Sequence, residues 1–130
     1  MCLGCDSGFG NRLALRLNAI GFRVYATVLD TNNTGSQQLS KCCETPEQMV
    51  VYKMDVTNDE EVRHVYRQVV EDLEKNNHKL WSVVNNAGYM ISGHIEWGTE
   101  EEYRRIFEVN VFGVIRVTRI FLPLIRQSKG

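Results

Sequence analysis

Short apolar runs alternate with helical segments along the whole chain. The runs at 22–29, 49–54 and 80–84 are rich in Val, Leu and Tyr and predict strands. Helices are expected at 8–20, behind Thr57, behind Thr99, and at 109–126. The polar stretch 30–47 is expected to be a loop, with a short helix around 36–41 as the alternative. Strands separated by helices are typical of a parallel sheet with crossover connections, so the pattern predicts an α/β fold.

Local signals indicate where several helices begin and which faces they bury. Thr57 with Glu60, and Thr99 with Glu102, each match a capping box, in which the first residue caps the helix and a Glu bonds back. Apolar residues at helical spacing predict one buried face of the first helix: Phe9, Leu13, Leu17 and Ile20. The segment 109–126 is apolar on nearly all sides, which indicates burial against the sheet and a second subunit.

Composition supports one domain and excludes several classes of function. The 130 residues are 43% hydrophobic and carry a net charge of -1, which leaves no basic excess for binding nucleic acid. The first residues lack the basic and apolar regions of a secretory signal. The most apolar stretch, 109–125, is interrupted by Arg116 and Arg119, and spanning a bilayer takes about 20 apolar residues. We therefore expect an intracellular location.

Four cysteines raise the question of a metal site. Cys2 and Cys5 have zinc-knuckle spacing, and Cys42 and Cys43 are adjacent. A zinc site needs two well-spaced pairs, so we expect neither a metal nor a structural disulfide. Free thiols fit a reducing compartment.

A glycine-rich loop stands immediately before the first helix. Gly4, Gly8 and Gly10 would let the backbone approach a pyrophosphate, and the helix N-terminus offers free N–H groups to an anion. Ser7 could add a hydroxyl donor. Three glycines can equally form a plain turn, so the loop alone does not decide the function.

Polar residues follow the ends of three predicted strands. Asp30 lies 20 residues after Gly10, where an acidic residue could hold the adenine ribose hydroxyls of NAD. Asp55 ends the next strand and could reach the adenine, or it could cap the following helix. The segment 85–88, Asn-Asn-Ala-Gly, follows the last strand, where it could pack against a cofactor or simply turn the chain.

Taken together, these motifs resemble the short-chain dehydrogenase/reductase family. The family's glycine loop stands here as Leu3 to Gly10, its adenine-side Asp as Asp55, its Asn-Asn-Ala-Gly motif at 85–88, and its helical Asn as Asn110. The residues within these motifs are similar to those of the branch that contains retinol, 17-beta-hydroxysteroid (type 6-like) and D-beta-hydroxybutyrate dehydrogenases. The resemblance implies a Rossmann-type, doubly wound parallel sheet over a partial dinucleotide-binding domain, 1–130.

The resemblance also implies roles for individual residues. It assigns binding of the pyrophosphate to the glycine loop and binding of the adenine to Asp55 and Val56. The ribose side of the cofactor is assigned to the Asn-Asn-Ala-Gly motif. Asn110 would belong to the catalytic site. In order along the chain, the implied cofactor residues are Gly4, Ser7, Gly8, Phe9, Gly10, Asp55, Val56, Asn86, Ala87 and Gly88.

The implied activity is an NAD(P)-dependent conversion between an alcohol and its carbonyl, on a steroid, retinoid or hydroxy acid. NAD is the favoured cofactor and NADP the alternative. The same resemblance suggests the endoplasmic reticulum or mitochondrion, membrane association of the full-length protein, and a homo-oligomer formed through the 109–126 helix.

The chain departs from the family pattern at several points. Leu3 replaces a Thr that ties the loop to the Asn-Asn-Ala-Gly segment, and Val28 stands where the family has its ribose-binding acid, two residues before Asp30. No Tyr is followed four residues later by Lys, the pair that performs the family's acid–base chemistry. We therefore expect an incomplete sheet, lacking most of its first strand and its C-terminal half, and an inactive isolated chain. A non-catalytic dinucleotide-binding or interaction module is the alternative; a nucleotide-fold methyltransferase fits less well.

Overall fold

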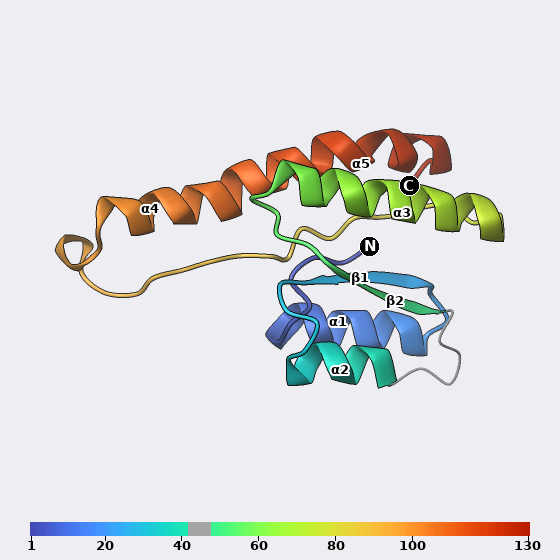
Figure 1. Cartoon of the computed structure of the whole chain (residues 1–130), viewed down its shortest axis with the longest axis horizontal. Coiled ribbons are helices and arrows are strands. Elements are labelled where there is room, and N and C mark those ends of the chain that lie inside the picture. Colours follow the sequence, from blue (N-terminus) through green and yellow to red (C-terminus); the bar gives the residue numbers. More distant parts are fainter. Residues whose placement is uncertain (42–47) are drawn as a thin grey trace.

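A small parallel sheet lies between two layers of helices (Figure 1). The computed structural model describes residues 1–41 and 48–130. Helices α1 and α2 cover one face of the sheet, α3 and α5 cover the other, and α4 extends away from the sheet. The elements are α1 (Gly8–Ala19), β1 (Val24–Val28), α2 (Thr34–Lys41), β2 (Met49–Lys53), α3 (Asp59–Asn76), α4 (Glu100–Phe107) and α5 (Val114–Ser128).

The first residues of the chain extend the sheet beyond β1. β1 pairs in parallel with β2, with Val24 opposite Met49. On the other side of β1, Cys2 forms parallel bridges to both Ala26 and Val84. Residues 1–3 therefore lie between β1 and the segment that ends at Val84, as the central strand of a doubly wound sheet does. The predicted α/β class is confirmed.

The predicted strand at 80–84 is present only as a trace. Val84 alone forms a bridge, donating its N–H to the carbonyl of Met1 at 2.9 Å, while its carbonyl accepts from Leu3 at 3.0 Å. Pairing ends here because residues 1–3 supply only a short partner. Leu80 is nevertheless buried, so the segment keeps its apolar contact with the core.

Apolar side chains form one cluster on each face of the sheet. Val117 and Phe121 of α5 pack with the apolar face of α3, and Phe121 meets the Tyr66 ring edge-on. On the opposite face, Ala14 and Leu39 pack beside Cys2 and Cys5. The predicted face of α1 is only half right. Leu13 and Leu17 pack against this second cluster, whereas Phe9 and Ile20, in its first turn and just after its end, are exposed.

One of the two predicted capping boxes is confirmed. Thr99 accepts a hydrogen bond from the Glu102 N–H, and the Glu102 carboxylate accepts one from the Thr99 N–H. The Thr57 assignment is wrong, because Asn58 caps α3 by accepting from the N–H groups of two following residues. The Thr57 hydroxyl donates to Asp55 instead, at 2.8 Å.

The predicted long helix runs from α4 through α5 with a change of pitch in the middle. Residues Glu108–Gly113 form a π-helical segment between the two α-helices. One face is buried through Val117 and Phe121, but Phe107, Phe112 and Ile115 are exposed. The expected burial on more than one side is therefore not met within a single chain. Among the described residues, no helix has the length and apolar character needed to cross a membrane.

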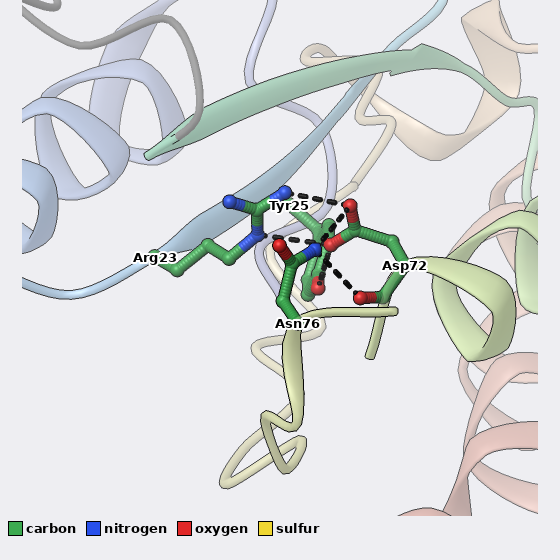
Figure 2. Close-up of polar contacts among 4 residues, drawn as sticks. All are labelled: Arg23, Tyr25, Asp72 and Asn76. Carbon is green, nitrogen blue, oxygen red and sulfur yellow. Dashed lines mark hydrogen bonds and ion pairs between the residues drawn. The ribbon is translucent and has the colours of Figure 1, made fainter. Parts of the chain in front are cut away.

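A polar cluster joins the start of β1 to the last turns of α3 (Figure 2). Arg23 donates to both carboxylate oxygens of Asp72, at 2.9 and 2.6 Å, and the Tyr25 hydroxyl donates to the same group at 2.5 Å. The Asn76 amide adds a fourth bond at 3.1 Å. This half-buried network fixes α3 at the end of the sheet opposite to the glycine loop.

Candidate dinucleotide-binding site

At Gly4 and Gly10 the glycine-rich loop passes so close to the Asn-Asn-Ala-Gly segment that a side chain could not be accommodated. A Cβ on Gly4 would lie 2.7 Å from the Cα of Ala87, and Gly4 has φ +65°. A Cβ on Gly10 would lie 2.3 Å from the amide nitrogen of Asn86. The structure thus brings the loop and the Asn-Asn-Ala-Gly segment together, and these glycines serve close approach as well as turning.

Asn86 is the residue that ties the two segments. Its side-chain amide donates to the carbonyls of Leu3 at 2.9 Å and Gly4 at 3.0 Å. The loop therefore stays linked to the Asn-Asn-Ala-Gly segment although Leu3 replaces the family's Thr, because the hydrogen bond from Asn86 uses the backbone carbonyl of Leu3 rather than a side-chain hydroxyl. The Leu3 side chain itself is buried in the core.

The N-terminus of α1 opens at the end of this loop. Ser7 occupies the N-cap position in an extended conformation and its side chain makes no capping bond. The first turn contains no acidic residue, and Ser7, Gly8 and Phe9 are exposed. A Cβ on Gly8 would meet nothing within 4 Å. The helix N-terminus is thus accessible, and its N–H groups and dipole favour an anion.

Asp6 holds the loop against the end of β1, a role that the sequence did not reveal. Its carboxylate accepts from the N–H of Leu29 at 2.9 Å, from the N–H of Asp30 at 3.2 Å, and from the Asn33 amide at 2.9 Å. On the other side of the loop, the buried Asn11 amide donates to the carbonyls of Cys5 and Gly35. No local pattern signals these bonds, since the partners of Asp6 lie 23 to 27 positions away.

Of the residues at the strand ends, Asp30 lies beside the glycine loop, whereas Asp55 and Val56 lie near the start of α3 and the π-helical segment. Asp30 is exposed beside Asp6, and its carboxylate accepts from the Asn32 N–H at 2.8 Å. The Asp55 carboxylate accepts from the N–H and hydroxyl of Thr57, so it shapes the start of α3. Val56 is buried, with Gly113 of the π-helical segment packed closely against it. Among the described residues, no hydrogen bond joins Asp55 to the glycine loop.

Asn110 lies in the π-helical segment and faces the end of the Asn-Asn-Ala-Gly motif. Its side-chain oxygen accepts from the Tyr89 N–H at 2.8 Å, and its amide donates to the Tyr89 carbonyl at 2.9 Å. A Cβ on Gly88 would lie 3.6 Å from the same oxygen. Single π-turns inside α-helices are frequent at functional sites, and here one presents an exposed Asn beside the predicted cofactor segment.

Cys2 and Cys5 are buried free thiols beneath the loop. The Cys5 thiol donates to the carbonyl of Cys2 at 3.3 Å. Hydrogen bonding with Cys2, together with burial, raises the pKa of the Cys5 thiol. No group of three His, Cys, Asp or Glu suited to a metal occurs among the described residues. The pair Cys42 and Cys43 lies outside them.

The residues present fit the pyrophosphate of a dinucleotide. The loop lacks side chains where they would block close approach, and the N-terminus of α1 stands at its open end with Ser7, whose side chain makes no capping bond. The Asn-Asn-Ala-Gly segment is fixed beside it by Asn86.

Comparison with known proteins agrees with this geometry. The chain is 44% identical over 130 residues to estradiol 17-beta-dehydrogenase 2 of Rattus norvegicus, covering 98% of this chain and 32% of that protein. It is 41% identical over 132 residues to the mitochondrial D-beta-hydroxybutyrate dehydrogenase of Bos taurus, covering 98% of this chain and 37% of that protein. The chain thus spans about a third of the length of these curated relatives.

A solved structure shows the same fold. The crystal structure of a short-chain dehydrogenase from Streptomyces avermitilis is 33% identical and superposes with a TM-score of 0.83, covering 98% of this chain and 45% of that one. The sequence model of the short chain dehydrogenase family matches residues 1–130. Because this match extends over its whole length, the chain belongs to the short-chain dehydrogenase family.

Proposed function

We propose that the chain is the cofactor-binding part of an NAD(P)-dependent oxidoreductase that interconverts an alcohol and its carbonyl compound. The observation that carries this proposal is the glycine loop, held by Asn86 and open at the N-terminus of α1. Such a loop, at the N-terminus of a helix, is suited to a pyrophosphate.

The cofactor would lie along the strand ends on this side of the sheet. Gly4, Ser7, Gly8, Phe9 and Gly10 would contact the pyrophosphate, and Asp30 the adenine ribose. The adenine would approach the backbone near Asp55 and Val56, with the second ribose against the segment 86–88. When bound, the nicotinamide ring supplies a site that accepts or releases a hydride.

The proposed substrate class is supported by the family and its named relatives. Those relatives are dehydrogenases of estradiol and of D-beta-hydroxybutyrate, both of which carry a secondary alcohol. We extend this to a small-molecule alcohol or ketone for the whole protein. Asn110, beside Tyr89, is proposed as a member of its catalytic site.

The proposal includes an assembly and a location. The exposed apolar side chains of Phe112 and Ile115 support a homo-oligomer formed through the 109–126 helix. An organelle location, the mitochondrion or the endoplasmic reticulum, and membrane association are drawn from the family; the bovine relative is named as mitochondrial.

Catalysis would need groups outside residues 1–130. No Tyr in the chain is followed four residues later by Lys, so a phenol activated by a neighbouring Lys is not supplied by it. We therefore expect the 130-residue chain to bind the dinucleotide without transferring hydride to an alcohol or carbonyl substrate.

Two substitutions at one exposed position test the binding site. Ser7→Asp places a carboxylate at the helix N-terminus, where it is a good N-cap, but it repels a pyrophosphate. Ser7→Asn is an equally good cap without the charge. Titration of NADH fluorescence should show binding to the unsubstituted chain and to Ser7→Asn, and at least about tenfold weaker binding to Ser7→Asp.

The outcomes separate binding from folding. Circular dichroism should give the same helix content for both variants, since both residues cap helices well. Absence of NADH binding by the unsubstituted chain at millimolar concentration, or equal affinities of the two variants, would contradict the proposed site.

A further inference from the structure

The end of β1 carries a cluster of hydrogen-bond donors that converges on one point. The backbone N–H groups of Leu29 and Asp30 and the side-chain amide of Asn33 all donate to Oδ1 of Asp6, at 2.9, 3.2 and 2.9 Å. Leu29 also donates to Oδ2 at 3.0 Å. Convergent neutral donors of this kind form an anion-binding cradle, and here the chain's own carboxylate fills it.

The cradle stands where a dinucleotide would place its adenine ribose. In a doubly wound sheet this ribose lies at the end of the strand that follows the glycine loop, which is β1 in this chain. NAD has a hydroxyl at the ribose 2′ position, whereas NADP has a phosphate. The donors that could bind such a phosphate are already occupied by Asp6.

The negative charge of Asp6 disfavours a 2′-phosphate in addition to its occupation of the donors. The donors to Asp6 are neutral amides, and no Lys, Arg or His of the described residues forms an ion pair with its carboxylate. Asp30 adds a second exposed carboxylate, whose own bond comes from the Asn32 N–H. A 2′-phosphate with a charge of about -1.5 to -2 would face both groups.

We propose that Asp6 sets the cofactor preference, by filling the anion cradle at the end of β1 and repelling the 2′-phosphate of NADP. This inference rests on the proposed dinucleotide site and assigns a specificity-determining residue within it. It differs from the role expected of Asp30, which would hydrogen-bond the ribose hydroxyls of NAD directly.

The isosteric variant Asp6→Asn separates charge from structure. Its side-chain oxygen can keep the three bonds now made to Oδ1, so the loop stays attached to β1 while the negative charge is lost. Asp6→Ala removes both the charge and the bonds. Glu71→Gln is the matched control, because it removes one exposed negative charge far from the cradle. Glu71 is next to Asp72, which pairs with Arg23 just before the start of β1, whereas the cradle lies at the end of this strand.

The measured quantity is the ratio of the dissociation constants of NADPH and NADH, from fluorescence titrations of the 130-residue chain. The unsubstituted chain should prefer NADH. Asp6→Asn should lower the ratio about tenfold, since one unit charge a few ångströms from a phosphate changes affinity by that order. Glu71→Gln should leave the ratio unchanged. Raising salt to about 1 M, where the screening length is about 3 Å, should weaken the preference of the unsubstituted chain for NADH over NADPH.

The outcomes distinguish this inference from the proposal on which it rests. If the unsubstituted chain binds neither cofactor, the dinucleotide site itself is wrong and the inference falls with it. If it binds NADH but prefers NADPH, or if Asp6→Asn leaves the ratio unchanged, Asp6 does not set the preference although the site stands. A loss of affinity for both cofactors in Asp6→Ala without a change in ratio would assign Asp6 a purely structural role.

Discussion

Replacing Asn86 by Ala should loosen the glycine loop and destabilise the chain by a predictable amount. The side-chain amide makes two hydrogen bonds, to the carbonyls of Leu3 and Gly4, in a partly buried position. Each such bond contributes about 1 kcal/mol to stability, so Asn86→Ala should cost about 2 kcal/mol. With an unfolding entropy of about 2.1 cal/mol/K per residue over 130 residues, this corresponds to a melting temperature about 7 °C lower.

The adjacent residue provides a matched control. Asn85 is exposed, and its amide makes one bond of 3.3 Å to the Thr118 hydroxyl. Asn85→Ala should therefore lower the melting temperature by no more than about 2 °C. Differential scanning fluorimetry compares the variants, and NADH titration should show the larger loss of affinity in Asn86→Ala. Equal melting temperatures for the two variants would refute the assigned tie between the loop and the segment 85–88.

Three further perturbations test the fold around the site. Burial alone would raise the pKa of Asp72, but hydrogen bonds from Tyr25 and Arg23 outweigh it and lower the pKa, so the stabilisation is present above about pH 4 and is lost at lower pH. Urea unfolding should therefore show the stability gap between the unsubstituted chain and Asp72→Asn closing as pH falls from 5 to about 3. Gly35→Ala would place a Cβ 1.9 Å from a backbone oxygen of the glycine loop, so α2 must shift, and thermal melts should show a loss of about 1–3 kcal/mol. Thr99→Ala removes the capping box of α4 and should reduce helical circular dichroism at a cost of about 1 kcal/mol; an unchanged spectrum and melt would contradict that assignment.

Features that depend on local spacing were predictable from the sequence. The glycines before α1, the alternation of strands and helices and the Thr99 capping box each depend on residues within a few positions of one another. The structure confirms α1, β1, β2 and the Thr99 capping box, with the ends of α1 and β2 each within one residue of the prediction, whereas the run at 80–84 forms only a single bridge. Segments in which a motif of fixed spacing adjoins a run with the hydrophobic period of a strand or helix are the easiest to recognise from sequence.

Features that depend on competition or on distant partners were not predictable. Thr57 and Asn58 are both followed three residues later by Glu, and Asn58 forms the cap because Asp55 engages the Thr57 hydroxyl. Phe9 has the right helical phase for burial but lies in the first turn, where it remains exposed. The bonds of Asp6 join segments more than 20 residues apart, and only the folded chain brings them together.

The N-terminus of α1 and the glycine loop are proposed to bind a nicotinamide dinucleotide. The most direct test is the ¹H–¹⁵N spectrum of the labelled chain during titration with NADH. We expect the amide signals of Gly8, Phe9 and Gly10 and the side-chain amide signal of Asn86 to shift together with one dissociation constant, while the signal of Lys129 stays in place. Shifts confined to other regions, or none at saturating NADH, would contradict it.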